Sequence, residues 1–225
     1  MRSALSKAEI ESSIASRFGD AFRIQEKTAP ETLSTGVTEV DALTGGIPRG
    51  AITEIFGPRS SGRTSLLYSA LAYATAHDEI CALVDTSDVF APRAAETAGI
   101  DLDRLLWVRC AGDLEHAFKA TDLLLHAGGF GLIVLDIGDV PVKDARRIIS
   151  SWWYRFRRTV ENRATAIVVI SEEACTRSCA AVTLELHGNG EWSGNLLSFN
   201  AINVNRCRPF WPTLTESQFR AQAIA

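Results

Sequence analysis

The sequence is poor in lysine and has no long apolar run. Only four of its 23 basic residues are lysines, so its cationic sites are mostly planar, forked guanidinium groups. No stretch approaches the ~18 consecutive apolar residues that a membrane helix needs, and the first residues carry no secretory signal pattern. These absences exclude a membrane span and lead us to expect a cytoplasmic protein.

Disulfide bonds and a strong overall positive charge are also missing. The five cysteines are odd in number and scattered, which favours reduced thiols over a disulfide framework. The net charge is −4, so contact with nucleic acid would need a local basic patch. A length of 225 residues is enough for one large domain.

From residue 50 onward, short apolar runs alternate with amphipathic segments. The runs predict strands over 52–56, 80–85, 105–109, 132–136 and 166–171, and the segments between them predict helices over 63–77, 92–99, 114–127 and 142–162. Continuous apolar strands joined by helices indicate an α/β fold with a mainly parallel sheet flanked by helices. After residue 180, alternating apolar residues around a turn at Gly188-Asn189-Gly190 predict a C-terminal antiparallel hairpin.

The N-terminal segment has a different pattern. Ile10, Ile14 and Phe18 recur at every fourth position and form a narrow apolar stripe on a short helix, with Phe22 following. We therefore expect an N-terminal docking arm over residues 1–32, a core over 33–212 and a polar C-terminal tail over 213–225.

A glycine-containing loop lies between the first core strand and its helix. The segment Gly57–Thr64 matches the phosphate-loop pattern G-x-x-x-x-G-K-[ST] except that Arg63 replaces lysine. The predicted nucleotide-binding residues are Gly57, Pro58, Arg59, Ser60, Ser61, Gly62, Arg63, Thr64 and Ser65. Thr64 and Asp136, which ends an apolar strand, are the candidate Mg²⁺ ligands. The alternative is an ordinary glycine-rich turn that caps a helix.

Several segments resemble the RecA recombinase core. They are Leu33–Gly36, Asp41–Leu43, Gly45–Gly50, Thr53–Gly62, Cys81–Asp85 and Gly99–Leu106, and the resemblance extends to Asp136 and to the strand that ends at Ser171. The combination of Arg63, the stretch 85–92 and Leu105–Cys110 resembles most closely the ImuA-type relatives. Those relatives are bacterial accessory proteins of damage-induced (SOS) mutagenesis and are associated with a Y-family polymerase homologue.

The resemblance implies a RecA-like P-loop NTPase core in which several working residues have changed. The catalytic glutamate of the family falls on Ser87, the tyrosine that stacks on adenine on Ala94, and the γ-phosphate-sensing glutamine on Glu172. Asp88 or Glu172 remains a candidate replacement for the lost acid, and the catalytic residues are unknown. The two DNA-gripping loops shrink to about 137–142 and 172–180. ATP and Mg²⁺ are therefore implied ligands of a degenerate site.

A helix over 142–162 would carry two faces. Ile149, Trp152, Trp153, Phe156 and Val160 would share an apolar face, and Arg147, Arg155 and Arg158 would gather on the opposite face. This arginine face is either a contact for DNA phosphates or an acidic partner, or simply a solvated surface.

Two functional hypotheses follow from the resemblance. The first is an accessory protein of bacterial DNA repair and SOS-induced translesion mutagenesis, whose partners are RecA or RecA-like subunits, copies of itself or the Y-family polymerase homologue. The alternative is a DNA-dependent ATPase or recombinase that binds ATP and single-stranded DNA. A third possibility is a regulator that senses ATP without hydrolysing it.

Overall fold

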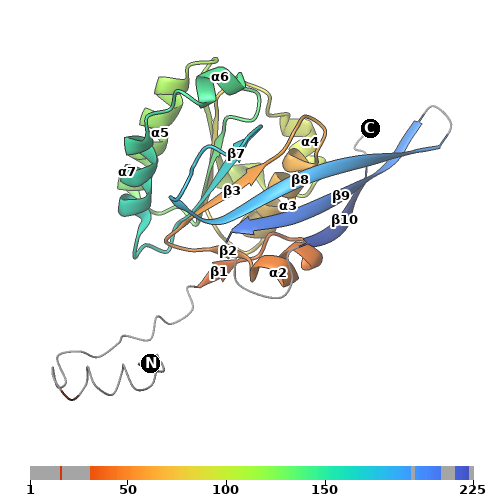
Figure 1. Ribbon diagram of the computed structural model, residues 1–225, viewed down its shortest axis with the longest axis horizontal. Coiled ribbons are helices and arrows are strands. Elements are labelled where there is room, and N and C mark those ends of the chain that lie inside the picture. The colour runs from red at the N-terminus through yellow and green to blue at the C-terminus, as the bar shows by residue number, and fades with distance from the viewer. Residues whose placement is uncertain (1–15, 17–30, 194–195, 209–215, 223–225) are drawn as a thin grey trace, which may run out of the picture. The chain divides into compact units, whose positions relative to one another are not determined.

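The computed structural model describes residue 16 and residues 31–193, 196–208 and 216–222 (Figure 1). The chain divides into two units between Pro30 and Glu31, and the fold below is that of the second unit. The predicted arm residues Ile10, Ile14, Phe18 and Phe22 lie outside the described residues.

A mostly parallel sheet forms the centre of the fold. Its strands are β3 (Ile52–Phe56), β4 (Cys81–Asp85), β5 (Leu105–Arg109), β6 (Leu132–Asp136), β7 (Ala166–Ser171), β8 (Ala180–Ser193), β9 (Leu196–Arg208) and β10 (Glu216–Gln222). They lie in the order β10-β9-β8-β3-β7-β6-β4-β5, in which only the pairings β8–β9 and β9–β10 are antiparallel. A separate pair consists of β1 (Thr32–Leu33) and β2 (Ile47–Pro48). The predicted fold class is confirmed.

Helices cover both faces of the sheet (Figure 1). They are α2 (Thr38–Thr44), α3 (Arg63–Ala76), α4 (Pro92–Thr97), α5 (Leu114–Ala127), α6 (Val142–Ala145) and α7 (Ser150–Val160), with a 3₁₀ turn η2 at Leu102–Arg104. The α3 side chains pack on one face and the α5 and α7 side chains on the other, because alternate residues of each strand point to opposite faces. Within the described parts of the chain, no helix has the length and apolar character to cross a bilayer.

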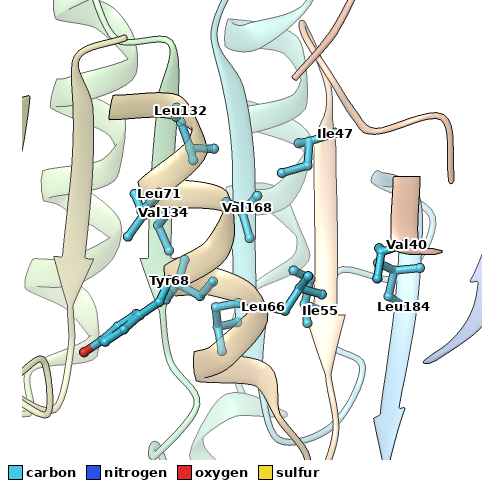
Figure 2. Close-up of a cluster of buried hydrophobic side chains, with 14 of the residues drawn as sticks. Val40, Ile47, Ile55, Leu66, Tyr68, Leu71, Leu132, Val134, Val168 and Leu184 are labelled. Carbon is cyan, nitrogen blue, oxygen red and sulfur yellow. The ribbon is translucent and has the colours of Figure 1, made fainter. Parts of the chain in front are cut away.

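The α3 face is an aliphatic layer. Figure 2 shows Leu66 and Leu71 of α3 over Val134 and Val168 of the neighbouring strands, and each of these side chains is almost fully buried. The packing fixes α3 against the strand ends. Its first residue, Arg63, is thereby placed beside the loops that follow β3 and β6.

The opposite face is aromatic. Phe118 of α5 stacks on Phe156 of α7 with ring centroids 5.5 Å apart, and it contacts Trp153 edge-on at 5.0 Å. All three rings are buried. This cluster joins the two helices to each other and to the sheet.

The predicted helix over 142–162 is wrong in its extent. The segment forms α6 and α7, separated by a turn at 146–149, and Ile149 is 68% exposed instead of joining the apolar face. No glycine or proline marks the break. At the break, the Arg146 guanidinium donates two hydrogen bonds of 2.7 and 3.1 Å to Glu173. This ion pair with a residue distant in sequence lies where α6 ends, although the apolar pattern of the sequence would continue the helix.

The end of the sheet also differs from the expectation. Gly188-Asn189-Gly190 does not turn but pairs with Asn200–Ile202 inside the ladder, and the pairing runs on to Ser193 opposite Leu196. Residues 216–222, expected in a polar tail, form β10 against β9 and bury Phe219.

We expect Phe156→Ala to lower the free energy of unfolding by about 3–5 kcal/mol, because it leaves a cavity beneath Phe118. Tyr154→Ala on the same helix, where the side chain is 54% exposed, should change it by less than about 0.5 kcal/mol. Urea unfolding of both variants measures the difference. Equal losses would contradict the assignment of α7's buried face.

Candidate nucleotide site

The parallel strands bring the candidate residues to one edge of the sheet. Asp85 at the end of β4 lies opposite Asp136 at the end of β6, and Phe56 at the end of β3 lies opposite Ser171 at the end of β7. The loop after β3 begins at this edge, where the Gly57 N–H donates to the Ser171 carbonyl at 3.3 Å. Residues 57, 85, 136 and 171, which are far apart in the sequence, therefore lie at the same edge of the sheet.

The candidate phosphate loop lies directly before α3, between this helix and β3. Gly62 caps the helix with a φ of +95°, a left-handed conformation that favours glycine, and a Cβ there would lie 2.2 Å from Cδ1 of Ile202. The buried loop residues are Gly57, Ser61, Gly62 and Arg63, and the exposed ones are Pro58, Arg59, Ser60, Thr64 and Ser65. The free N–H groups of the first turn make this end of α3 suited to an anion.

Arg63 does not extend into solvent. Its side chain is buried at 8% exposure, and Nη1 donates to the Gly138 carbonyl at 3.2 Å. Burial lowers the pKa of Arg63, and the nearby charges of Asp136, Asp139 and Glu172 oppose that shift. A guanidinium keeps its proton in such a setting, so a fixed positive charge lies next to the Asp136 carboxylate.

Asp136 lines the same small cavity as Arg63 and is bonded to the chain through one carboxylate oxygen. Its Oδ1 accepts the Gly138 N–H at 2.8 Å. Burial raises the pKa of Asp136 to about 6 even though this N–H lowers it, and the neighbouring Asp85 adds to the rise. Gly138 therefore connects the two charged groups through its N–H and its carbonyl.

The carboxylates near the lost catalytic position support the fold. Asp85 accepts the N–H groups of Val89 at 3.2 Å and Phe90 at 2.9 Å, and the Trp107 indole N–H at 3.2 Å. Asp88 pairs with Arg109 at 3.0 Å. Both oxygens of Asp85 are therefore engaged, whereas Oδ1 of Asp88 has no hydrogen-bond partner among the described residues, so Asp88 and the half-buried Glu172 stay candidates for the lost acid.

Sequence reasoning missed Tyr68 and Gly138. Both line a cavity of about 120 Å³ with Thr64, Phe90 and Asp136, and the Tyr68 hydroxyl accepts the Ala91 N–H at 3.3 Å. Tyr68 lies four residues after Thr64 on α3, so helical spacing alone places it over the loop. Ala94, the position of the adenine-stacking tyrosine, packs instead against the core.

The segments after β6 and β7, which the resemblance aligns with the family's two DNA-gripping loops, each contact the core through part of their length. After β6, Ile137 and Val140 are buried. After β7, residues 172–179 cross β3, where the buried Glu54 accepts the N–H groups of Cys175 at 2.6 Å and Thr176 at 2.9 Å and the Thr176 hydroxyl at 2.7 Å. Both segments are therefore short connections that contact the sheet.

The predicted arginine face is not assembled as expected. Arg147 lies in the turn before α7 rather than on the helix, and Arg155 forms two hydrogen bonds of 2.7 and 2.5 Å with Asp122 of α5. Arg158 is exposed on α7. The three side chains do not form one helical face, because the helix that was to carry them is interrupted.

The described residues fit a phosphate group better than a magnesium ion. The α3 N-terminus and the loop suit phosphate oxygens, whereas the Asp136 carboxylate already accepts an N–H and faces the charge of Arg63. Mg²⁺ needs near-octahedral oxygen ligands. Of the two predicted protein ligands, Thr64 and Asp136, the exposed Thr64 hydroxyl would be the one without a competing contact in this arrangement. No cluster of three His, Cys, Asp or Glu suited to a metal occurs among the described residues.

The raised pKa of Asp136 predicts a pH effect on stability. Between about pH 4 and pH 6 the folded protein keeps a proton that the unfolded chain has lost, so the free energy of unfolding falls as pH rises through this window. Asp136→Asn retains an oxygen acceptor for Gly138 and removes the effect. Its stability relative to the native protein should be higher at about pH 7.5 than at about pH 4 by up to about 3 kcal/mol. Urea unfolding at both pH values measures this, and an equal difference at both would contradict it.

Comparison with known proteins agrees with this arrangement. A family model described as the RecA N-terminal domain matches residues 4–145. RecA of Synechococcus sp. (strain CC9902) is 30% identical over 226 residues, which cover 92% of this chain and 57% of that protein. RecA of Aquifex pyrophilus is 29% identical over 181 residues, covering 72% and 52%.

The fold has a solved counterpart. The crystal structure of the RadB recombinase superposes with a TM-score of 0.65 at 21% identity, covering 84% of this chain and 96% of that one. The chain spans about half the length of the RecA proteins it matches. The family match, the sheet order and the loop that opens α3 together show that this chain belongs to the RecA family.

Proposed function

We propose that this chain is a RecA-fold accessory protein of bacterial DNA repair, acting in SOS-induced translesion mutagenesis and binding RecA-like or Y-family polymerase partners in the cytoplasm. The observation that carries the proposal is that the short segments after β6 and β7 are bound to the core of the domain. Glu54 accepts hydrogen bonds from Cys175 and Thr176 in the segment after β7, and Ile137 and Val140 are buried in the segment after β6. Segments held this way leave little chain to track a DNA strand.

The chemistry at the sheet edge supports the same proposal. Ser87 has no carboxylate with which to orient a water molecule, both oxygens of Asp85 accept backbone N–H groups, and one oxygen of Asp88 pairs with Arg109. In the proposed role the chain binds ATP, as its family does, and hydrolyses it weakly or not at all. ATP binding would then regulate the recognition of a protein partner and would not drive a cycle of hydrolysis.

The edge strand β5 is a candidate acceptor for a partner. It is the last strand of the described sheet, no described strand pairs with its outer edge, and Leu106 is 46% exposed. An open strand edge is a template for a strand of another chain. The predicted docking arm, whose apolar stripe lies on a helix, would be a separate contact by which copies of this chain or RecA subunits associate.

A recombinase remains the second candidate function. The left-handed Gly62 that opens α3 and the RecA family match are features that a working DNA-dependent ATPase also has. The two candidates differ in turnover, because only the recombinase needs a carboxylate that activates water.

We expect negligible ATP turnover, with or without single-stranded DNA, because Ser87 cannot act as a base. Phosphate release measured beside a RecA recombinase of known activity tests this. DNA-stimulated turnover comparable to that of the recombinase, abolished by Asp136→Ala, would favour the second candidate and contradict the accessory role.

We expect Ile14→Asp with Phe18→Asp to abolish association with RecA or with further copies of the chain, while the Tm of the core stays nearly unchanged. Burying these two side chains contributes roughly 3 kcal/mol or more, which corresponds to at least about a hundredfold in Kd. The matched control, Ser12→Asp with Ser16→Asp, adds the same charge on the opposite side of the predicted helix and should retain association. Analytical ultracentrifugation measures the association of both double variants, and thermal unfolding measures the Tm of the core. Unfolding of the core with association intact would show that the arm packs on its own domain.

A further inference from the structure

Arg63 occupies the place beside the phosphate loop where a cation is expected. A Cβ on Gly138 would lie 3.0 Å from Oδ1 of Asp136 and 3.2 Å from Nη1 of Arg63, so the carboxylate and the guanidinium flank the same glycine. Arg63 is held there by the Gly138 carbonyl and by burial. The positive charge at this position therefore belongs to the chain.

A divalent ion would have to displace this arrangement. Oδ1 of Asp136 already accepts the Gly138 N–H at 2.8 Å, and a metal bound to this carboxylate would share one small cavity with the Arg63 guanidinium. Like charges in a poorly hydrated site repel strongly. Lysine, a compact point charge on a flexible stem, lacks the planar bulk that Arg63 places next to Asp136.

The loop nevertheless retains the groups that recognise phosphate. The first N–H groups of α3 lack partners within the helix, as at any helix start. Ser61 is 1% exposed, and its hydroxyl has no hydrogen-bond partner within the described residues. A Cβ on Gly57 would lie 2.8 Å from that hydroxyl, so it lies against the first residue of the loop. This hydroxyl is enclosed by the loop and is not among the described groups that line the cavity beside Arg63, so the α3 N–H groups and Arg63 are the groups that can meet a phosphate.

We propose that loop 57–64 binds the phosphates of a nucleoside diphosphate or triphosphate without a divalent metal, with Arg63 supplying the charge that Mg²⁺ would otherwise supply. This inference rests on the degenerate nucleotide site of the proposed function and names its ligand chemistry. The cavity next to Arg63, about 120 Å³, is smaller than a typical ligand pocket, so the phosphates contribute most of the recognition.

Calorimetric titration of the full chain with ADP, in EDTA and in excess Mg²⁺, tests the proposal. We expect the Kd in EDTA to be equal to or lower than the Kd in Mg²⁺, because the metal sequesters ADP in solution and adds nothing in the site. Binding that is tenfold or more tighter with Mg²⁺ would overturn the proposal, and so would the absence of binding in both buffers.

Two variants locate the effect at Arg63. Arg63→Ala should weaken ADP binding in EDTA by about tenfold or more, in line with the loss of a charge-assisted hydrogen bond. Arg63→Lys keeps the charge but vacates the space beside Asp136, so its ADP affinity should rise when Mg²⁺ is added. Arg63→Ala binding as tightly as the native protein in EDTA would contradict the role of this side chain.

The comparison of the ADP Kd in EDTA and in Mg²⁺ uses the native chain, so it does not depend on whether either variant folds. Its failure is also separable from failure of the accessory role. Metal-dependent ADP binding without turnover would overturn only the metal-free site, whereas DNA-stimulated turnover would overturn the proposed function.

Discussion

The parallel register of β3, β7, β6 and β4 is the constraint on which the candidate site depends. Parallel strands end at one edge, so the loop after β3 and the segments after β4, β6 and β7 are forced together although they are up to about a hundred residues apart in sequence. The aliphatic layer under α3 then fixes Arg63 at that edge. A change that shifted α3 would move the guanidinium away from Gly138 and separate the loop from Asp136.

Acidic side chains of β3, β4 and β6 are engaged by the chain itself. Asp85 organises the turn that ends at Phe90, Asp136 accepts the N–H of Gly138, and Glu54 holds the segment after β7. Each carboxylate satisfies backbone donors that would otherwise be costly to bury.

Much of the fold is predictable from local sequence patterns. The strands at 52–56, 132–136 and 166–171 and the helix at 114–127 have the predicted bounds, because buried parallel strands are mainly apolar and α5 is amphipathic. The edge strand at 105–109 also has its predicted bounds, although it is only partly buried. The glycines of the phosphate loop, the position of Thr64 and the arginine at 63 are likewise visible in the sequence.

The differences arise where distant residues override local pattern. The break between α6 and α7 has no glycine or proline signal and coincides with the pairing of Arg146 with Glu173. Gly188-Asn189-Gly190 has turn chemistry, yet the ladder of β8 with β9 continues through it. The inward course of Arg63 and the pairing of Arg155 with Asp122 depend on elements that meet only in the folded protein.

The central claim, that Arg63 replaces a metal ion beside the phosphate loop, is tested most directly by a crystal structure of the full chain grown with ADP and Mn²⁺. Mn²⁺ scatters anomalously and prefers the same oxygen ligands as Mg²⁺. The account predicts phosphate density at the start of α3, Arg63 still bound to the Gly138 carbonyl, and no anomalous peak at Asp136. An anomalous peak bridging Thr64 and Asp136, with the guanidinium displaced, would contradict it.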